Sequence, residues 1–263
     1  MNATFAVVAA TAAAVVAAIA LRVRALDRGG ALAAWAIGTA TLAVGGIAPA
    51  LVVLAFFLSS SALSRIGRAR KRALLDGAKD GPRDARQVLA NGGIATGCLL
   101  AAAALPAHHE ALLAAFAGAY AAACADTWGT EIGMLAAAPV RSILTLRPIQ
   151  PGLSGGITMQ GTLAEGAGAA FIAACARWSA LAPFIPVAMG GIAGALLDSI
   201  LGATMQHRRF CPTCARICET EVHRCGTSTV PHSGLRALDN DTVNLAATAC
   251  GAAVAYVAAP YFF

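Results

Sequence analysis

Long apolar stretches alternate with short polar segments along the whole chain, and this pattern predicts the secondary structure. A helix that crosses a bilayer needs about 20 mostly apolar residues. By this measure the sequence predicts an all-α, polytopic transmembrane helix bundle of about seven or eight helices, some of them short or broken. The expected helices span 3–21, 30–46, 48–63, 93–106, 110–137, 160–177, 183–205 and 243–260. We treat residues 1–263 as a single integral-membrane domain.

The positive charges indicate how these helices are oriented. If the N-terminus lies outside the cell, the segments 22–29, 64–92, 138–159 and 206–242 all face the cytoplasm, and they hold 18 of the 19 Lys and Arg residues. Lys and Arg are concentrated in cytoplasmic loops. We therefore expect a multi-pass protein of the inner (plasma) membrane, with its active face cytoplasmic. Because the first charges follow the N-terminal apolar stretch, that stretch is interpreted as a retained helix.

The composition agrees with a membrane protein, since 58% of residues are hydrophobic and only 12% are charged. A soluble protein is about a quarter charged. The basic segment 64–92 has two interpretations: attraction to anionic lipid headgroups, or a funnel for a phosphorylated substrate with Arg86, Gln87 and Asn91 nearest the membrane. Nucleic acid is a poor partner for it, because the segment is short and tethered to a bilayer.

Four carboxylates lie within or near the ends of the expected helices: Asp126, Glu131, Glu165 and Asp198. An ionisable group inside a membrane costs about 3 kcal/mol on insertion scales, so it normally faces a cavity or a partner. Asp126 shares a helix face with small residues, whereas Glu131 lies about 140° around the helix. We therefore expect the two to face one narrow site only if the helix unwinds. Asp198 lies on a glycine-rich face.

Two further polar segments are candidates for binding phosphate or metal. The segment "RPIQPGLSGGITMQ" contains Gly155 and Gly156, and successive backbone N–H groups in such a turn form an anion-binding nest beside a helix expected near Thr158. The segment "LDNDTVN" contains Asp239, Asp241 and Asn244. These oxygen ligands are interpreted either as a helix cap or, with Asp126, as a Mg²⁺ site.

The segment 206–242 also contains "CPTCARICETEVHRC". A Cys-x-x-Cys pair followed by a His/Cys pair fits a tetrahedral zinc site. The expected ligands are Cys211, Cys214, His223 and Cys225, with a set of reduced thiols as the alternative. Four protein ligands would close the coordination sphere, so the expected Zn²⁺ is structural.

Taken in order, "NGG", "ADTWGTEIG", "PGLSGGITMQGTLAEGAGA", "GALLDSILGATMQ" and "LDNDTVN" resemble the integral-membrane family that includes plant chloroplast phytyl-phosphate kinase. That family looks distantly similar to dolichol and phytol kinases and to CTP:phosphatidate cytidylyltransferase. The resemblance implies transfer from a nucleotide, CTP with Mg²⁺, to an isoprenoid monophosphate. It places Asp126 and Glu131 in an acidic motif, Ser154, Gly155 and Gly156 in a phosphate-side turn, and Asp198 and Asp241 in the remaining polar set. The Cys/His segment is not part of the resemblance.

Three hypotheses follow. A membrane kinase of a prenyl or phytyl phosphate would use Asp126, Glu131 and Asp198 in catalysis and Asn91, Arg86 and the turn for the substrate. A transporter or lipid flippase would instead place its carboxylates near the bilayer midplane. A membrane scaffold with a zinc-stapled loop leaves the intramembrane acids unexplained. Carboxylates near helix ends favour the kinase.

Overall fold

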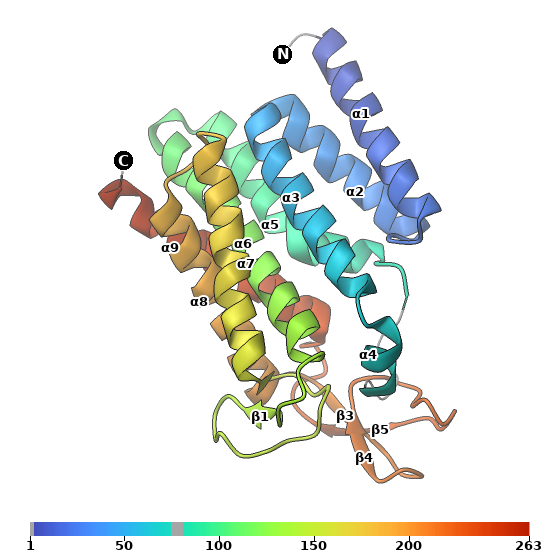
Figure 1. The fold of residues 1–263 in the computed structure, drawn as a ribbon. Coiled ribbons are helices and arrows are strands. Elements are labelled where there is room, and N and C mark those ends of the chain that lie inside the picture. The colour runs from blue at the N-terminus through green and yellow to red at the C-terminus, as the bar shows by residue number, and fades with distance from the viewer. Residues whose placement is uncertain (1–2, 75–80, 263) are drawn as a thin grey trace.

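The computed structural model describes residues 3–74 and 81–262, and it is a helix bundle with a small strand-containing lobe at one end (Figure 1). Lys79, one of the basic residues of segment 64–92, lies outside the described residues. The nine α-helices of the described ranges are α1 (Ala3–Arg22), α2 (Arg28–Ala40), α3 (Ile47–Arg65), α4 (Arg68–Leu74), α5 (Ala85–Ala104), α6 (His109–Gly133), α7 (Met159–Trp178), α8 (Phe184–Thr204) and α9 (Asn240–Ala258).

The predicted polytopic all-α bundle is confirmed. Six helical segments of the described residues are long and apolar enough to cross a membrane, namely Thr4–Arg22, Ile47–Arg65, Ala85–Ala104, Pro106–Gly133, Phe184–Thr204 and Asn240–Tyr261. The other two predicted segments are also helical. They are α2, extended by the π-helix Thr41–Gly45, and α7.

The basic segment 64–92 is not a continuous loop, which differs from the prediction. It contains α4, and α5 begins at Ala85 rather than near residue 93. The cause is a capping box: the Asp84 carboxylate accepts from the Gln87 N–H, and the Gln87 side chain accepts from the Asp84 N–H. Each contact satisfies a backbone donor that the first turn leaves unpaired, so the helix starts two turns early.

Helix α6 forms the centre of the bundle. It packs against α3, α5, α7, α8 and α9, and its residues 114–125 are all buried. Most of these are alanine, and glycines line the neighbouring helices. Gly118, Gly190 and Gly251 bring α6, α8 and α9 into backbone contact: a Cβ added at Gly251 would lie 2.7 Å from the Gly118 carbonyl oxygen. Small residues of this kind allow membrane helices to approach closely.

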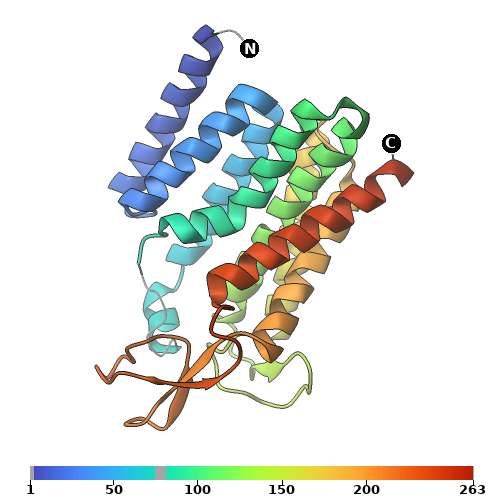
Figure 2. The same cartoon turned by 180° about the vertical axis from the view of Figure 1, so that it is seen from behind.

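The polar segments gather at one end of the bundle, opposite both termini (Figure 2). Two small antiparallel sheets form there. Strand β1 (Arg141–Ser142) pairs with β2 (Gly156–Ile157), and β3 (Arg208–Cys211) lies between β4 (Arg216–Cys218) and β5 (Val230–Ser233), all antiparallel. We call residues 206–238 the strand lobe. The sequence pattern did not predict these strands.

The glycine contact between α9 and its neighbours yields a stability prediction. Replacing Gly251 with Ala forces a methyl group against the carbonyl oxygens of Gly118 and Gly190, and overpacking of this kind costs about 1–3 kcal/mol. Gly93→Ala on α5 is the matched control, because a Cβ there meets no heavy atom within 4 Å. We expect thermal unfolding in detergent to show a lower midpoint for Gly251→Ala only; equal midpoints would contradict the packing.

Candidate functional site

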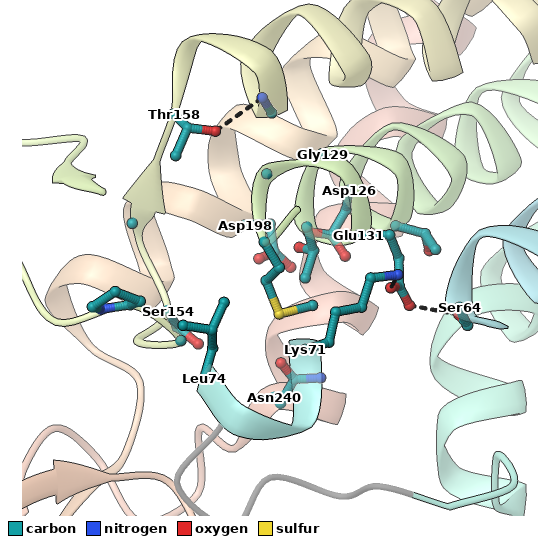
Figure 3. Close-up of a pocket in the computed structure, with 18 of the residues that line it drawn as sticks. Ser64, Lys71, Leu74, Asp126, Gly129, Glu131, Ser154, Thr158, Asp198 and Asn240 are labelled. Atoms are coloured by element: carbon teal, nitrogen blue, oxygen red, sulfur yellow. Dashed lines mark hydrogen bonds and ion pairs between the residues drawn. The ribbon is translucent and has the colours of Figure 1, made fainter. Parts of the chain in front are cut away.

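A large cavity lies where the bundle meets the polar segments, and we call it the polar pocket. It has a volume of about 640 Å³, and residues from all four polar segments of the sequence line it, among them Arg24, Lys71, Ser154 and Glu219. Figure 3 shows its centre, with Asp126, Glu131 and Asp198 facing the same space. The four polar segments, which the sequence predicts to lie on one side of the membrane, therefore meet at one end of the bundle.

One wall of the polar pocket is acidic. Asp126 on α6, Glu165 on α7 and Asp198 on α8 are half-buried and line it, and the charges of Asp126 and Glu165 both act on Asp198. Gly129 makes room for this arrangement, because a Cβ there would lie 2.4 Å from Glu165 Cγ. Among the described residues, none donates a hydrogen bond to these three carboxylates and none forms an ion pair with them. Half-buried like charges without partners are suited to a bound cation.

Asp126 and Glu131 both line the polar pocket although α6 does not unwind between them. The prediction excluded this arrangement only for a narrow site, and the pocket is wide enough to receive two faces of one helix. Glu131 is already engaged, accepting hydrogen bonds from Ser64 of α3 and from the Lys71 ammonium of α4. It therefore holds α4 and α3 at the rim of the pocket (Figure 3).

Another part of the lining of the polar pocket is basic, and we call it the basic wall. Its cationic residues come from segments 22–29 and 64–83, and they are Arg24, Arg65, Arg68, Arg70, Lys71 and Arg83. Arg83 is fixed by its backbone, whose N–H donates to the Ala25 carbonyl and whose carbonyl accepts from the Asp27 N–H. Its guanidinium lies 5.9 Å from the Phe56 ring centroid. Burial lowers the pKa of Arg83, and the Glu131 charge opposes that shift.

Arg86, Asp239 and Asp241 lie beside the polar pocket but are not among the residues that line it. Arg86 Nη2 donates to Asp239 Oδ2 at 2.8 Å, and Asp239 Oδ1 caps α9 by accepting from the Thr242 N–H. Partial burial alone would raise the pKa of Asp239, but these hydrogen bonds lower it. For Asp239 the structure therefore supports the capping interpretation. The two predicted amide residues, Asn91 and Asn244, do line the pocket.

The glycine-rich turn reaches the polar pocket with Ser154, Gly155 and Gly156. Gly155 has φ +79° and lies against Ala203 of α8, where a side chain would clash. Two N–H groups of the expected anion nest are engaged inside the protein: Ser154 donates to Glu219 Oε1 at 2.9 Å, and Gly156 donates to the Leu153 carbonyl. The turn therefore offers an anion fewer backbone donors than its sequence indicated.

An apolar groove of about 180 Å³ adjoins the polar pocket, with lining residues from α1, α2, α3, α5 and α6. Alanine, valine, leucine and phenylalanine side chains make up most of it. Arg83, Gln87 and Asn91 line the groove and the polar pocket alike. The two spaces therefore meet at three polar side chains, at the depth where α5 enters the bundle.

The Cys/His residues predicted to bind zinc come together in the strand lobe. The ligand atoms of Cys211, Cys214, His223 and Cys225 all lie within 4.8 Å of one another. The pKa of the Cys225 thiol is lowered to about 6 by hydrogen bonds with Thr227 and His223, and that of Cys214 is raised to about 11, chiefly by its hydrogen bond with Cys225. Among the described residues this is the one group of three or more His, Cys, Asp and Glu that meets a metal-binding spacing.

Sequence reasoning missed three residues that organise the site. Lys71 is one of several basic residues in a run, and nothing in the run distinguishes the one that is buried. Gln206 precedes the Cys/His segment and Glu219 lies within it, and both contact Ser154. Gln206 Nε2 donates to Ser154 Oγ and to Glu219 Oε2, each at 2.9 Å, and Glu219 accepts from the Ser154 N–H. Their role depends on a contact across more than 50 residues of sequence, which no local pattern signals.

Comparison with known proteins yields one family and several relatives. A family described as "Integral membrane protein DUF92" matches residues 11–252. Protein PGR of Arabidopsis thaliana is 32% identical over 91% of this chain and 91% of its own length. Two proteins described as uncharacterised membrane proteins are also similar: one from Synechocystis, 30% identical over 66% of this chain and 70% of its own, and one from Methanocaldococcus jannaschii, 32% identical over 70% and 76%. No solved structure matches.

The buried ion pair at the rim of the pocket gives a second stability prediction. Lys71→Met leaves the Glu131 carboxylate half-buried without its cation, and Glu131→Gln leaves the Lys71 ammonium unpaired; breaking such a pair from one side costs about 3–5 kcal/mol. The double variant leaves no unpaired charge, so it should lose less than the sum of the single losses. Unfolding midpoints in detergent measure this cycle, with the exposed Arg70→Met as control. Additive losses would contradict the pairing.

Proposed function

The chain belongs to the DUF92 family of integral membrane proteins, and from that premise we propose that it is a membrane-embedded phosphotransferase. The proposed reaction transfers the γ-phosphoryl group of a nucleoside triphosphate, CTP by resemblance, to an isoprenoid monophosphate at the cytoplasmic face. A phosphate oxygen of the lipid forms a bond to the γ-phosphorus, and the bond between the γ-phosphorus and the β–γ bridging oxygen breaks. The products are a lipid diphosphate and a nucleoside diphosphate.

The single observation that carries the proposal is the junction of the polar pocket with the apolar groove at Arg83, Gln87 and Asn91. A lipid phosphate likewise has a polar part and an apolar part, namely a dianionic head group and an apolar chain. Arg83 supplies a permanent positive charge to the head, and Gln87 and Asn91 supply amide donors. The groove receives the first part of the prenyl chain, because its lining is almost wholly apolar.

The acidic wall suits the nucleotide side of the reaction. Mg²⁺ is commonly held by one or two carboxylates together with phosphate oxygens and water, and Asp126, Glu165 and Asp198 offer unpartnered carboxylates without forming a complete protein-only site. Mg²⁺ bound there would neutralise the charge of the phosphates. The positive charges of the basic wall attract both anionic substrates and bring them together. Positioning and charge neutralisation of this kind are most of what phosphoryl transfer requires of a protein.

Glu131 and Ser154 act as positioning residues in this proposal. Glu131 fixes Lys71 and therefore α4, which brings the basic wall to face the acidic one. Ser154 Oγ accepts from Gln206, and its N–H donates to Glu219, so the glycine-rich turn is held between α8 and the strand lobe. Arg86 and Asp239 form an ion pair beside the entrance, and Arg86 contributes positive charge to the approach of the substrates.

The depth of the carboxylates favours this function over transport. Asp126 and Asp198 lie seven and six residues before the ends of α6 and α8, which is about 9–11 Å along each helix. A transporter would hold coupling carboxylates near the bilayer midplane. Here they open toward the loop end, where a soluble nucleotide can reach them.

The activity test uses purified protein in nanodiscs with Mg²⁺, labelled CTP or ATP, and prenyl and phytyl monophosphates. We expect label in a lipid diphosphate, and a loss on the order of 100-fold or more in Asp126→Asn and Asp198→Asn, the size found when one charge-stabilising group is removed. Glu110→Gln is the matched control, because Glu110 begins the same helix at its far, exposed end. No transfer from folded protein with any acceptor would contradict the proposal.

Chain-length dependence tests the groove separately. Ala34 of α2 lines the groove, whereas Ala36 faces outward from the same helix. Ala34→Trp fills the groove, so KM for a long prenyl monophosphate should rise on the order of tenfold, equivalent to about 1.4 kcal/mol. KM for an acceptor of one isoprene unit should not change, and Ala36→Trp should alter neither. An equal rise in KM for both acceptors in Ala34→Trp would show that the prenyl chain does not bind in the groove.

A further inference from the structure

The strand lobe is unusually poor in apolar core for a folded unit. Its fully buried residues are Gln206, Cys211, Cys218, His223 and Thr229, and none of them is a leucine, isoleucine, valine or phenylalanine. Units of fewer than about 40 residues usually need a metal or disulfides in place of a hydrophobic core. Residues 206–238 nevertheless form three paired strands. Some other interaction must therefore hold the lobe together.

The four clustered ligand atoms all lie within 4.8 Å of one another, close enough to surround one zinc ion after small adjustments. Zn–S and Zn–N bonds of about 2.3 and 2.0 Å place neighbouring ligand atoms about 3.3–3.8 Å apart. Cys211 Sγ lies 3.7 Å from Cys225 Sγ, and His223 Nδ1 lies 3.1 Å from Cys225 Sγ. Cys218 is buried near the same sheet but its thiol donates to the Thr220 carbonyl, outside the cluster. The donor set is thus three thiols and one imidazole, a common structural zinc set.

We propose that Cys211, Cys214, His223 and Cys225 bind one structural Zn²⁺, and that this ion fixes the position of the glycine-rich turn of the polar pocket. Cys211 ends β3 and Cys214 lies in the turn that leads to β4, whereas His223 and Cys225 belong to the segment between β4 and β5. The ion therefore joins the hairpin to the segment that follows it. This closes the lobe without any contribution from a hydrophobic core.

The link from the zinc cluster to the polar pocket runs through short hydrogen bonds. Arg208 of β3 donates to the carbonyl oxygens of Ser154 and Gly202 at 3.0 and 2.9 Å. Glu219, next to β4, accepts from the Ser154 N–H, and Gln150 donates to the Ile217 carbonyl at 3.1 Å. Both strands of the hairpin that the ion ties to the following segment thus hold the turn, so releasing the ion should loosen the turn on two sides.

Metal analysis of the purified full-length chain tests the site directly. Elemental mass spectrometry should find about one zinc ion per chain, and Cys214→Ser and His223→Ala should each lose it. Cys218→Ser is the matched control, since it removes a thiol of the same lobe that is outside the cluster, and it should keep the ion. Cys214 is exposed, so its variant removes a ligand without opening a buried space. Zinc absent from the wild type, or lost equally in Cys218→Ser, would overturn the proposal.

Two further measurements distinguish zinc from the alternatives. The first measurement is alkylation of the cysteines in metal-free protein that was purified under reducing conditions. A disulfide between two of the cluster cysteines would leave two cysteines that alkylation does not modify, and this result would overturn the site. Hydrogen exchange after treatment with a zinc chelator tests the link: amides of 150–157 and of the strand lobe should exchange faster together. Faster exchange in the lobe alone would overturn the proposed link to the turn. Neither readout depends on phosphotransfer.

Discussion

Close packing around α6 is the constraint on which the rest of the structure depends. Alanines on α6 and glycines on its neighbours let α7, α8 and α9 approach until backbone atoms touch. A helix surrounded so tightly cannot place a charged side chain in the middle of the bundle. Asp126 is therefore found where the packing begins to open, and Glu165 and Asp198 are brought to the same level because their helices lie against the same core.

Separation of charge across the polar pocket follows from this arrangement. The acidic wall belongs to the packed helices α6, α7 and α8, whereas the basic wall belongs to the end of α3, to α4 and to the segments before α2 and α5. The attachment of the basic wall depends on specific pairs, such as Lys71 with Glu131 and the backbone of Arg83 with that of Ala25 and Asp27. The function that we propose needs both walls, because it brings two anionic substrates and a cation together. The polar end of a membrane bundle can hold both walls without burying net charge in the lipid.

The strand lobe, at the same end of the molecule, holds the glycine-rich turn in place. The glycine-rich turn has little secondary structure, and its Gly155 adopts a conformation that few other residues tolerate. Contacts with Arg208, Gln206 and Glu219 hold that turn from outside the membrane. A small polar lobe can do this only if it is itself rigid, and the zinc ion that we propose would supply that rigidity where apolar residues are too few to form a core.

The sequence by itself determined the helical bundle, its eight apolar segments and the gathering of the basic segments at one end, because hydrophobic length and positive charge act locally. It also singled out Asp126, Asp198, Asn91 and the Cys/His cluster as unusual residues in their surroundings. Only the tertiary structure decided which of them meet. Glu131 forms an ion pair with a lysine 60 residues earlier in the sequence. Arg86 and Asp239 form an ion pair with each other and do not line the pocket. Such pairings depend on how helices from distant parts of the chain pack, and side-chain periodicity carries no information about a neighbour that lies on another helix.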